Sequence, residues 1–218
     1  MSDTKATVVW EKIRATYSNL LQSNCLPGNK SSGRIVCDKK MATKTTITWE
    51  QFLAAGVEGQ KCEWVDGEIV QMTPVNLRHE AILWRLIASL AEYCRSHPEW
   101  IGFTSNAAFT MASGNWRCPD ASLVRKERFA GAQIPVMAEF APDVAFEVYS
   151  PSNQPSEIQS KRKDYQQSGV VQVWIDPEKR LVELVYPNRP LEFFQEDQPL
   201  TIAGLPDFSL DLKELFAF

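Results

Sequence analysis

The chain of 218 residues is 44% hydrophobic and 23% charged, which is ordinary for a globular protein and long enough for one sizeable core. No apolar run approaches the roughly 20 residues that span a bilayer, and the N-terminus lacks the apolar stretch of a signal peptide, so we expect a cytoplasmic protein. The net charge of −4 argues mildly against a protein that coats nucleic acid by charge alone.

Residues 1–40 differ from the rest of the chain. Apolar residues at helical spacing between Val9 and Leu21 predict a short amphipathic helix, and the polar stretch PGNKSSGR then predicts a linker. Met41 begins a segment that looks like a second chain start. Two explanations of residues 1–40 stay open, an upstream extension or a docking helix, and one domain is predicted over 41–218.

The segment 45–71 predicts a short helix and then a hairpin. Thr48 opens a capping box, so the helix is expected to begin at Trp49. KCEWVDGEIVQM then alternates apolar and polar residues around Asp66-Gly67, the strongest short hairpin signal.

A long helix follows, with Asn76 as its N-cap and Pro98 marking its end. Helical spacing predicts one apolar stripe that faces the core. The stripe consists of Ile82, Leu83, Leu86, Ile87, Leu90 and Cys94. The tryptophans are also expected in the core, among them Trp64, Trp84 and Trp174.

The second half of the domain predicts several strands and one further helix. Ser156 opens a second capping box and Gly169 suits the position after the last helical turn, so a helix is expected between them. A last strand or short helix is expected near LKELF. The strand-like runs are FTSNAAFTM, CPDASLV, APDVAFEVYSPS, VVQVWID and RLVELVY. This order predicts an α/β (α+β) fold with a mixed sheet flanked by helices.

The strand APDVAFEVYSPS carries two acids on one face. Side chains alternate along a strand, so Val144 and Phe146 suit the core while Asp143 and Glu147 share the opposite face. These two acids are about 13 Å apart, too far to share a metal ion whose oxygen ligands lie about 2–2.5 Å away. A cation at Glu147 would need a partner acid from a neighbouring strand, and Asp120 in WRCPDASLV is the obvious candidate.

The helix after this strand carries a lysine on its inward stripe. Ile158 and Tyr165 lie two turns apart on one face, and Lys161 falls between them, whereas Lys163 points elsewhere. A buried lysine needs a negative partner. Two hypotheses fit: Asp120 and Glu147 hold a divalent cation beside Lys161, or Glu147 and Lys161 form a structural ion pair.

Several of these segments, in this order, resemble the Uma-two family of putative restriction endonucleases, within the PD-(D/E)XK nuclease superfamily. The segments are WVDGEIVQMTP, CPD, APDVAFEVYSPS, SKRKDYQQSGV and VWIDP, and the resemblance runs from about residue 45 to residue 216. It implies a restriction-endonuclease-like core in which Asp120 and Glu147 are the motif acids that bind Mg²⁺ or Mn²⁺. Position 149 is Tyr149 where the superfamily pattern has lysine, so the catalytic lysine is sought at Lys161.

Four further residues are weaker candidates. Glu63 occupies a position that is also acidic in the family pattern. Two interpretations stay open for it: a further carboxylate of the metal site, or an exposed acid on a strand. Asp143 is expected to support a neighbouring loop. His79 is expected to be a packing residue with its hydrogen bonds satisfied, rather than a catalytic one. Tyr165 is expected to be a core aromatic rather than a catalytic phenol. The basic runs RKER and KRK could contact phosphates or simply be solvated.

The resemblance implies a metal-dependent endonuclease with DNA as substrate, and a homodimer because two active sites cut two strands. A catalytically silent nucleic-acid-binding or assembly protein on the same fold is the first alternative. A nuclease that acts on RNA or branched structures is the second.

Overall fold

The computed structural model describes residues 62–71, 76–129, 134–135, 138–151 and 153–217. The predictions for the N-terminal extension, for a domain start at Met41 and for a helix from Trp49 lie outside the described residues.

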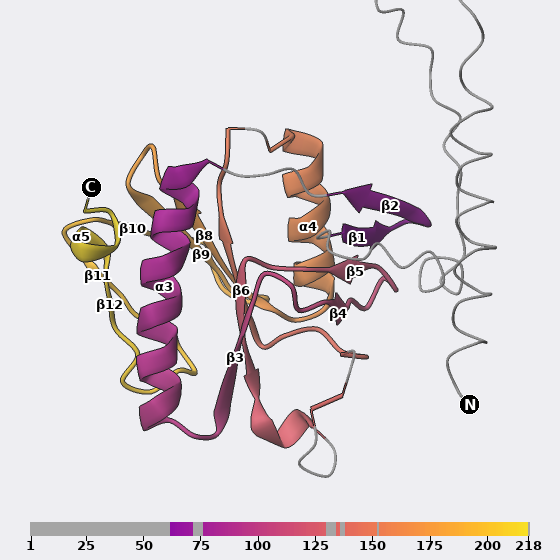
Figure 1. Cartoon of the computed structure of the whole chain (residues 1–218), viewed down its shortest axis with the longest axis horizontal. Helices are drawn as coiled ribbons and strands as arrows, with labels where there is room; N and C mark the ends of the chain where they lie inside the picture. Colours follow the sequence, from indigo (N-terminus) through magenta and orange to yellow (C-terminus); the bar gives the residue numbers. More distant parts are fainter. Residues whose placement is uncertain (1–61, 72–75, 130–133, 136–137, 152, 218) are drawn as a thin grey trace, which may run out of the picture.

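A six-stranded mixed sheet forms the centre of the protein, in the order β10-β9-β8-β7-β6-β3 (Figure 1). Its strands are β3 (Trp100–Thr104), β6 (Ala121–Arg125), β7 (Val144–Val148), β8 (Val171–Asp176), β9 (Leu181–Val185) and β10 (Glu192–Gln195). Neighbouring strands are antiparallel except β7 and β8, which are parallel. The crossover between these two is helix α4 (Pro155–Gln167). The predicted mixed sheet is therefore confirmed.

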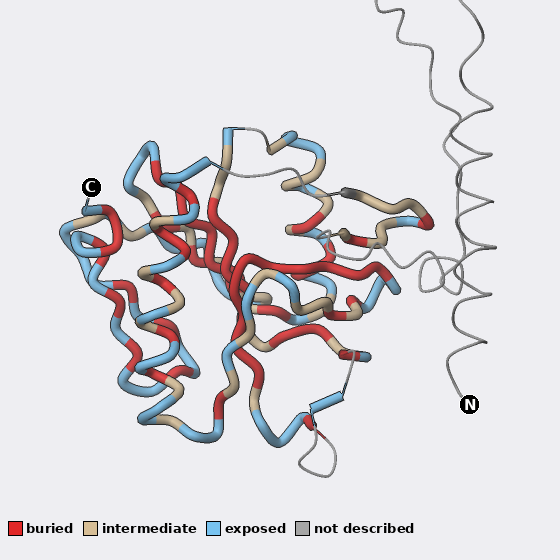
Figure 2. The backbone as a smooth tube through the Cα atoms, viewed as in Figure 1, coloured by how far each residue is buried: buried red, intermediate tan, exposed pale blue. Residues whose placement is uncertain are grey.

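The two helices cover opposite faces of this sheet. Helix α3 (Leu77–Ser96) packs on one face and α4 on the other, with the strands between them (Figure 1). In β7, Val144 and Phe146 pack in the cluster of α3, while Ala145 packs in the cluster of α4, as the alternation predicts. Buried residues accordingly concentrate along the central strands (Figure 2). Glu147 shares the face of Ala145 and is directed toward α4.

A second, four-stranded sheet lies on the α4 side, in the order β2-β1-β5-β4 (Figure 1). Its strands are β1 (Cys62–Val65), β2 (Glu68–Gln71), β4 (Phe109–Thr110) and β5 (Trp116–Arg117). The predicted hairpin is confirmed: Asp66 and Gly67 have φ values of 50° and 84°, the conformation of a type I′ turn. This sheet brings Glu63 and Arg117 next to α4.

Short elements complete the chain. The 3₁₀ turn η1 (Lys126–Arg128) follows β6. On the α3 side, β11 (Pro199–Leu200) and β12 (Leu210–Asp211) pair, and α5 (Leu212–Leu215) follows, so the segment near LKELF forms both a strand and a short helix. Among the described residues, no helix is long and apolar enough to cross a membrane.

The N-terminal cap agrees with the sequence prediction at α3 and differs from it at α4. Asn76 caps α3, because its side chain accepts the backbone N–H of His79 at 2.9 Å. The prediction that Ser156 caps α4 is wrong: the N-cap is Gln154 and Pro155 occupies the first helical position, where the missing N–H costs nothing. The helix ends as expected, with Gly169 at φ 73°.

The prediction that Trp84 belongs to the core is wrong, since its side chain is 75% exposed. The apolar stripe of α3 is confirmed: four of its members are buried, Ile82, Leu83, Leu86 and Leu90, and the other two are partly buried, Ile87 and Cys94. Trp84 lies on the outward side of the same helix.

These burial differences predict opposite effects of two substitutions on α3. Leu86→Ala should lower the free energy of unfolding by about 2–5 kcal/mol, because Leu86 is fully buried and the substitution leaves a cavity. Trp84→Ala should change it by no more than about 0.5 kcal/mol, as is usual for surface positions. Urea denaturation of both variants measures the difference, and equal losses would contradict the placement of Trp84.

Candidate active site

Glu147 and Lys161 meet between the central sheet and α4, at the buried positions that the sequence predicted. The Lys161 Nζ lies 3.3 Å from each carboxylate oxygen of Glu147. The Tyr165 hydroxyl, one helical turn further along α4, donates to Glu147 Oε1 at 2.6 Å. Tyr165 is thus a core aromatic, as expected, but its polar end also fixes the position of the Glu147 carboxylate.

Asp120 immediately precedes β6 and contacts β7 beside Glu147. The β6–β7 ladder ends with the pair of Ala121 and Phe146, so Asp120 and Glu147 are the residues next to that last pair in the two segments. Asp120 Oδ2 accepts the backbone N–H of Val148 at 3.0 Å. The structure therefore brings the Asp120 carboxylate to the backbone of β7, one residue along from Glu147.

His79 contacts the other side of this acid. The imidazole is only 3% exposed, and its Nε2 lies 3.2 Å from Asp120 Oδ2. His79 sits in the first turn of α3, where the Asn76 cap holds its backbone. It is a buried, partnered histidine whose partner is one of the two motif acids.

Glu63 is fully buried, so the alternative of an exposed strand acid is wrong. Its Oε1 lies 3.2 Å from the Lys161 Nζ and accepts the backbone N–H of Cys118 at 3.1 Å. Its Oε2 accepts from Arg117 Nη1 at 2.9 Å. Lys161 consequently contacts two carboxylates from two different sheets.

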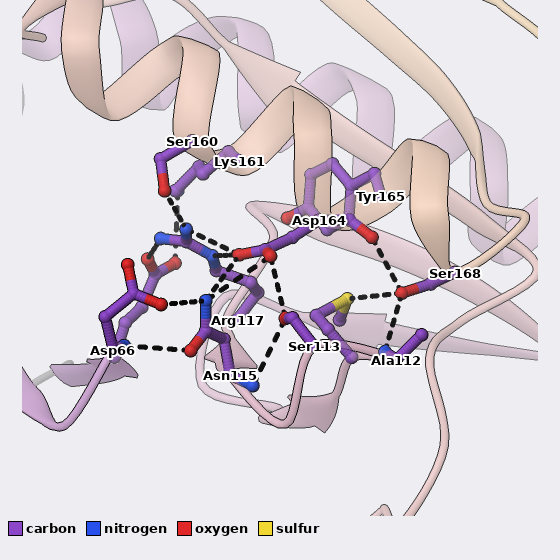
Figure 3. Close-up of polar contacts among 12 residues, drawn as sticks. Asp66, Ala112, Ser113, Asn115, Arg117, Ser160, Lys161, Asp164, Tyr165 and Ser168 are labelled. Carbon is purple, nitrogen blue, oxygen red and sulfur yellow. Dashed lines mark hydrogen bonds and ion pairs between the residues drawn. The ribbon is translucent and has the colours of Figure 1, made fainter.

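Arg117 links Glu63 to helix α4. Its Nε donates to Asp164 Oδ2 at 2.7 Å and its Nη2 donates to the Ser160 hydroxyl at 2.6 Å. Figure 3 shows the guanidinium of Arg117 between the side chains of Ser160 and Asp164, with Lys161 on the same stretch of helix. We call Glu63, Arg117, Ser160 and Asp164 the Arg117 cluster.

Arg117 and Asp164 are not among the site residues predicted from the sequence. Arg117 is 1% exposed although arginine is almost never fully buried without a partner. Two signals were present: Arg117 stands three residues before Asp120 in an apolar strand, and Asp164 follows Lys161 by three residues on the inward side of α4. Neither signal reveals which residue pairs with which.

The charges of the site shift the pKa values of its groups. Burial alone would raise the pKa of Glu63, but the positive charges of Lys161 and Arg117 outweigh it and leave that pKa below its ordinary value. Burial would likewise lower the pKa of Lys161, yet the carboxylates of Glu147, Glu63 and Asp120 raise it above its ordinary value. Lys161 is therefore a permanent cation. Tyr165 stays protonated, because burial and the charge of Glu147 raise its pKa well above the ordinary value.

The donor set fits a hard divalent cation. Asp120, just before β6, and Glu147 of β7 supply carboxylate oxygens. Such cations accept one or two carboxylates, with water and phosphate oxygens completing the shell. The described residues contain no group of three or more His, Cys, Asp or Glu side chains that could hold a metal ion. Buried acids also outnumber buried permanent cations here, so the site has a formal charge of −2 when His79 is neutral. The acids are Glu63, Asp120, Glu147 and Asp164, and the cations are Arg117 and Lys161.

The remaining candidates lie outside this site. Asp143 accepts the backbone N–H of Arg125 at 2.8 Å and lies 3.3 Å from Arg128, a support of the neighbouring loop as expected. Arg162, on the same helix as Lys161, stacks on Trp174 and pairs with Glu183. These arginines of RKER and KRK therefore have protein partners.

Comparison with known proteins gives a consistent result. The model of the family Uma2, described as putative restriction endonuclease, matches residues 49–213. A search of curated proteins finds no match. A crystal structure of a putative nuclease belonging to DUF820 from Anabaena variabilis superposes with a TM-score of 0.70 at 21% identity, covering 78% of this chain and 97% of that one. At 21% identity the similarity shows a shared fold, and the superposition covers nearly all of the other chain.

Proposed function

This chain belongs to the Uma2 family of putative restriction endonucleases, and from that premise we propose that it is a metal-dependent endonuclease that hydrolyses phosphodiester bonds of DNA. One observation carries the proposal: Asp120 Oδ2 accepts the backbone N–H of Val148, the residue after Glu147, and the Lys161 amine lies 3.3 Å from Glu147. The resemblance had assigned the catalytic lysine to Lys161, and the buried position of this amine supports that assignment.

Asp120 and Glu147 are the residues that would hold Mg²⁺ or Mn²⁺. The ion would lower the pKa of a bound water molecule and neutralise negative charge at phosphorus. The protein holds both acids in place beforehand: Tyr165 donates to Glu147, while Asp120 accepts the Val148 N–H. Such fixed second partners raise the precision of metal ligands.

Lys161 would supply a fixed positive charge next to the scissile phosphate. Because its pKa is raised, the amine stays protonated and acts as a hydrogen-bond donor rather than as a general base. Preorganised donors in a water-poor site stabilise developing negative charge far better than donors in water. This role suits Lys161, a residue that is only 4% exposed.

Cleavage of supercoiled plasmid tests the proposal. Purified protein should nick the plasmid in Mg²⁺ or Mn²⁺ and should lose this activity in excess EDTA, because the proposed activation of water and neutralisation of charge at phosphorus both depend on the bound cation. A preparation from cells that carry the empty vector controls for contaminating nuclease. Cleavage that persists in EDTA would contradict the metal-dependent reaction.

Calorimetric titration with Mn²⁺ tests the ligand assignment separately. Asp120→Asn and Glu147→Gln should each weaken Mn²⁺ binding by at least about 10-fold, since each removes a charged ligand.

A double-strand cut needs two such sites, so a homodimer is part of the proposal. Light scattering of the purified protein would measure this oligomeric state.

A catalytically silent nucleic-acid-binding protein on the same fold is the second candidate. The observation that favours it is the ion pair itself, because Lys161 already neutralises much of the charge of Glu147 without a metal. Absence of cleavage on supercoiled, linear and single-stranded DNA, together with retained DNA binding, would favour this candidate over the first.

A further inference from the structure

We propose that Glu63 is a positioning residue that holds the Lys161 ammonium in the site, fixed in turn by Arg117, and that Glu63 is not a metal ligand. The inference rests on the proposed function, because it assigns a role around the same site. Its starting point is that Lys161 contacts Glu63 Oε1 at 3.2 Å as well as Glu147 at 3.3 Å.

The lysine needs this second carboxylate when a cation binds. A metal ion bound to Glu147 would compete with Lys161 for the same carboxylate. Its positive charge would also repel the nearby ammonium. A buried ammonium without an anionic partner is strongly destabilised. Glu63 lies on the other sheet and remains available to Lys161 under these conditions.

Glu63 is poorly suited to bind the metal itself. Both of its oxygens are engaged: Oε1 by Lys161 and the Cys118 N–H, Oε2 by Arg117. The carboxylate is 0% exposed. A change of partner would break three interactions and leave the Arg117 guanidinium with a buried, unpaired side.

Arg117 ties the second sheet to the helix that carries the lysine. It contacts Glu63 on one side and Asp164 on the other, at 2.9 and 2.6 Å. Asp164 lies three residues after Lys161, so the same helical segment carries both the lysine and the point where Arg117 is attached. The Arg117 cluster thus fixes the distance between Glu63 and the base of the lysine side chain.

The location of the lysine explains why such a support is needed. The strand position two residues beyond Glu147 is occupied by Tyr149, whose hydroxyl accepts from Arg162. A strand lysine would be positioned by the sheet itself. A lysine carried by α4 depends on a contact with elements that lie far from it in the chain, and Glu63 with Arg117 provides that contact.

A double-mutant cycle on cleavage tests the inference. Glu63→Gln should lower the single-turnover rate in saturating Mg²⁺ by about 10–100-fold, the usual cost of an outer-shell partner. In the Lys161→Met background the same substitution should cause no further loss, because Glu63 acts only through Lys161. Multiplicative losses in the double variant would overturn the proposal.

Mn²⁺ calorimetry separates positioning from ligation. Glu63→Gln should bind Mn²⁺ within about two-fold of wild type, unlike Asp120→Asn and Glu147→Gln, whose loss should reach at least about 10-fold. A comparable loss of affinity for Glu63→Gln would make Glu63 a metal ligand and overturn the proposal. Glu183→Gln is the matched control, since Glu183 pairs with Arg162 on the same helix, outside the site.

Thermal unfolding in EDTA decides the inference independently of catalysis. If wild-type protein cleaves no DNA, the proposed function fails, but the contact can still be measured. The loss of melting temperature in the Glu63→Gln and Lys161→Met double variant should be smaller than the sum of the two single losses, because both members of a buried pair are removed together. Additive losses would show that Glu63 does not hold the lysine.

Discussion

Replacement of Lys161 by methionine is expected to lower the rate of DNA cleavage by about 10²–10³-fold, the typical cost of removing one preorganised donor. Methionine keeps most of the length and apolar bulk of the lysine stem but removes the charge. Lys161 contacts both Glu147 and Glu63. Its loss therefore also removes the positive charge that offsets the repulsion between these two carboxylates. Single-turnover cleavage of a defined duplex in saturating Mg²⁺ measures the effect.

Lys163→Met provides the matched control for this prediction. Lys163 is on the same helix, two residues away and exposed, so the identical substitution there removes a charge without touching the site. We expect its cleavage rate to stay close to that of wild type. Equal losses in both variants would mean that Lys161 acts only through the general positive charge of α4, and the assigned role would be wrong.

Arg117→Met is expected to lower the free energy of unfolding by about 3–5 kcal/mol, because removal of one partner of a buried ion pair leaves the other charge uncompensated. Here two carboxylates lose their cation, Glu63 and Asp164, which are 0% and 3% exposed. The loss is a large fraction of the stability of an ordinary domain, about 5–15 kcal/mol. Urea denaturation monitored by tryptophan fluorescence measures it.

An exposed ion pair supplies the control. Arg78 pairs with Glu178, and their side chains are 49% and 64% exposed. Arg78→Met should change the free energy of unfolding by less than about 1 kcal/mol, as exposed pairs usually do. Should Arg117→Met prove no more destabilising than Arg78→Met, the Arg117 cluster would not be an important support of this fold.

Helical periodicity determines which side chains of α3 face the core. Trp84 was expected inside because tryptophan is large and apolar, yet it is 75% exposed. It immediately follows Leu83 of the buried stripe, and one residue turns an α-helix by about 100°. The periodicity of the helix was therefore a better guide than the hydrophobicity of one residue.

Local patterns in the sequence determined much of the site. Alternation along β7 indicated that Glu147 faces away from Val144 and Phe146, and helical spacing indicated that Lys161 shares a face with Tyr165. The structure agrees on both orientations. Such predictions succeed because the periods of strand and helix are fixed by backbone geometry, whatever packs against them.

Only the tertiary structure decided which groups meet. Glu63 and Arg117 come from short strands 54 residues apart in the chain, and Asp164 lies 47 residues beyond Arg117. Periodicity gives the face on which a side chain lies but carries no information about the element packed against that face. A buried charge needs a partner, and the sequence alone could predict that need without predicting that Glu63, held by Arg117, would meet it for Lys161.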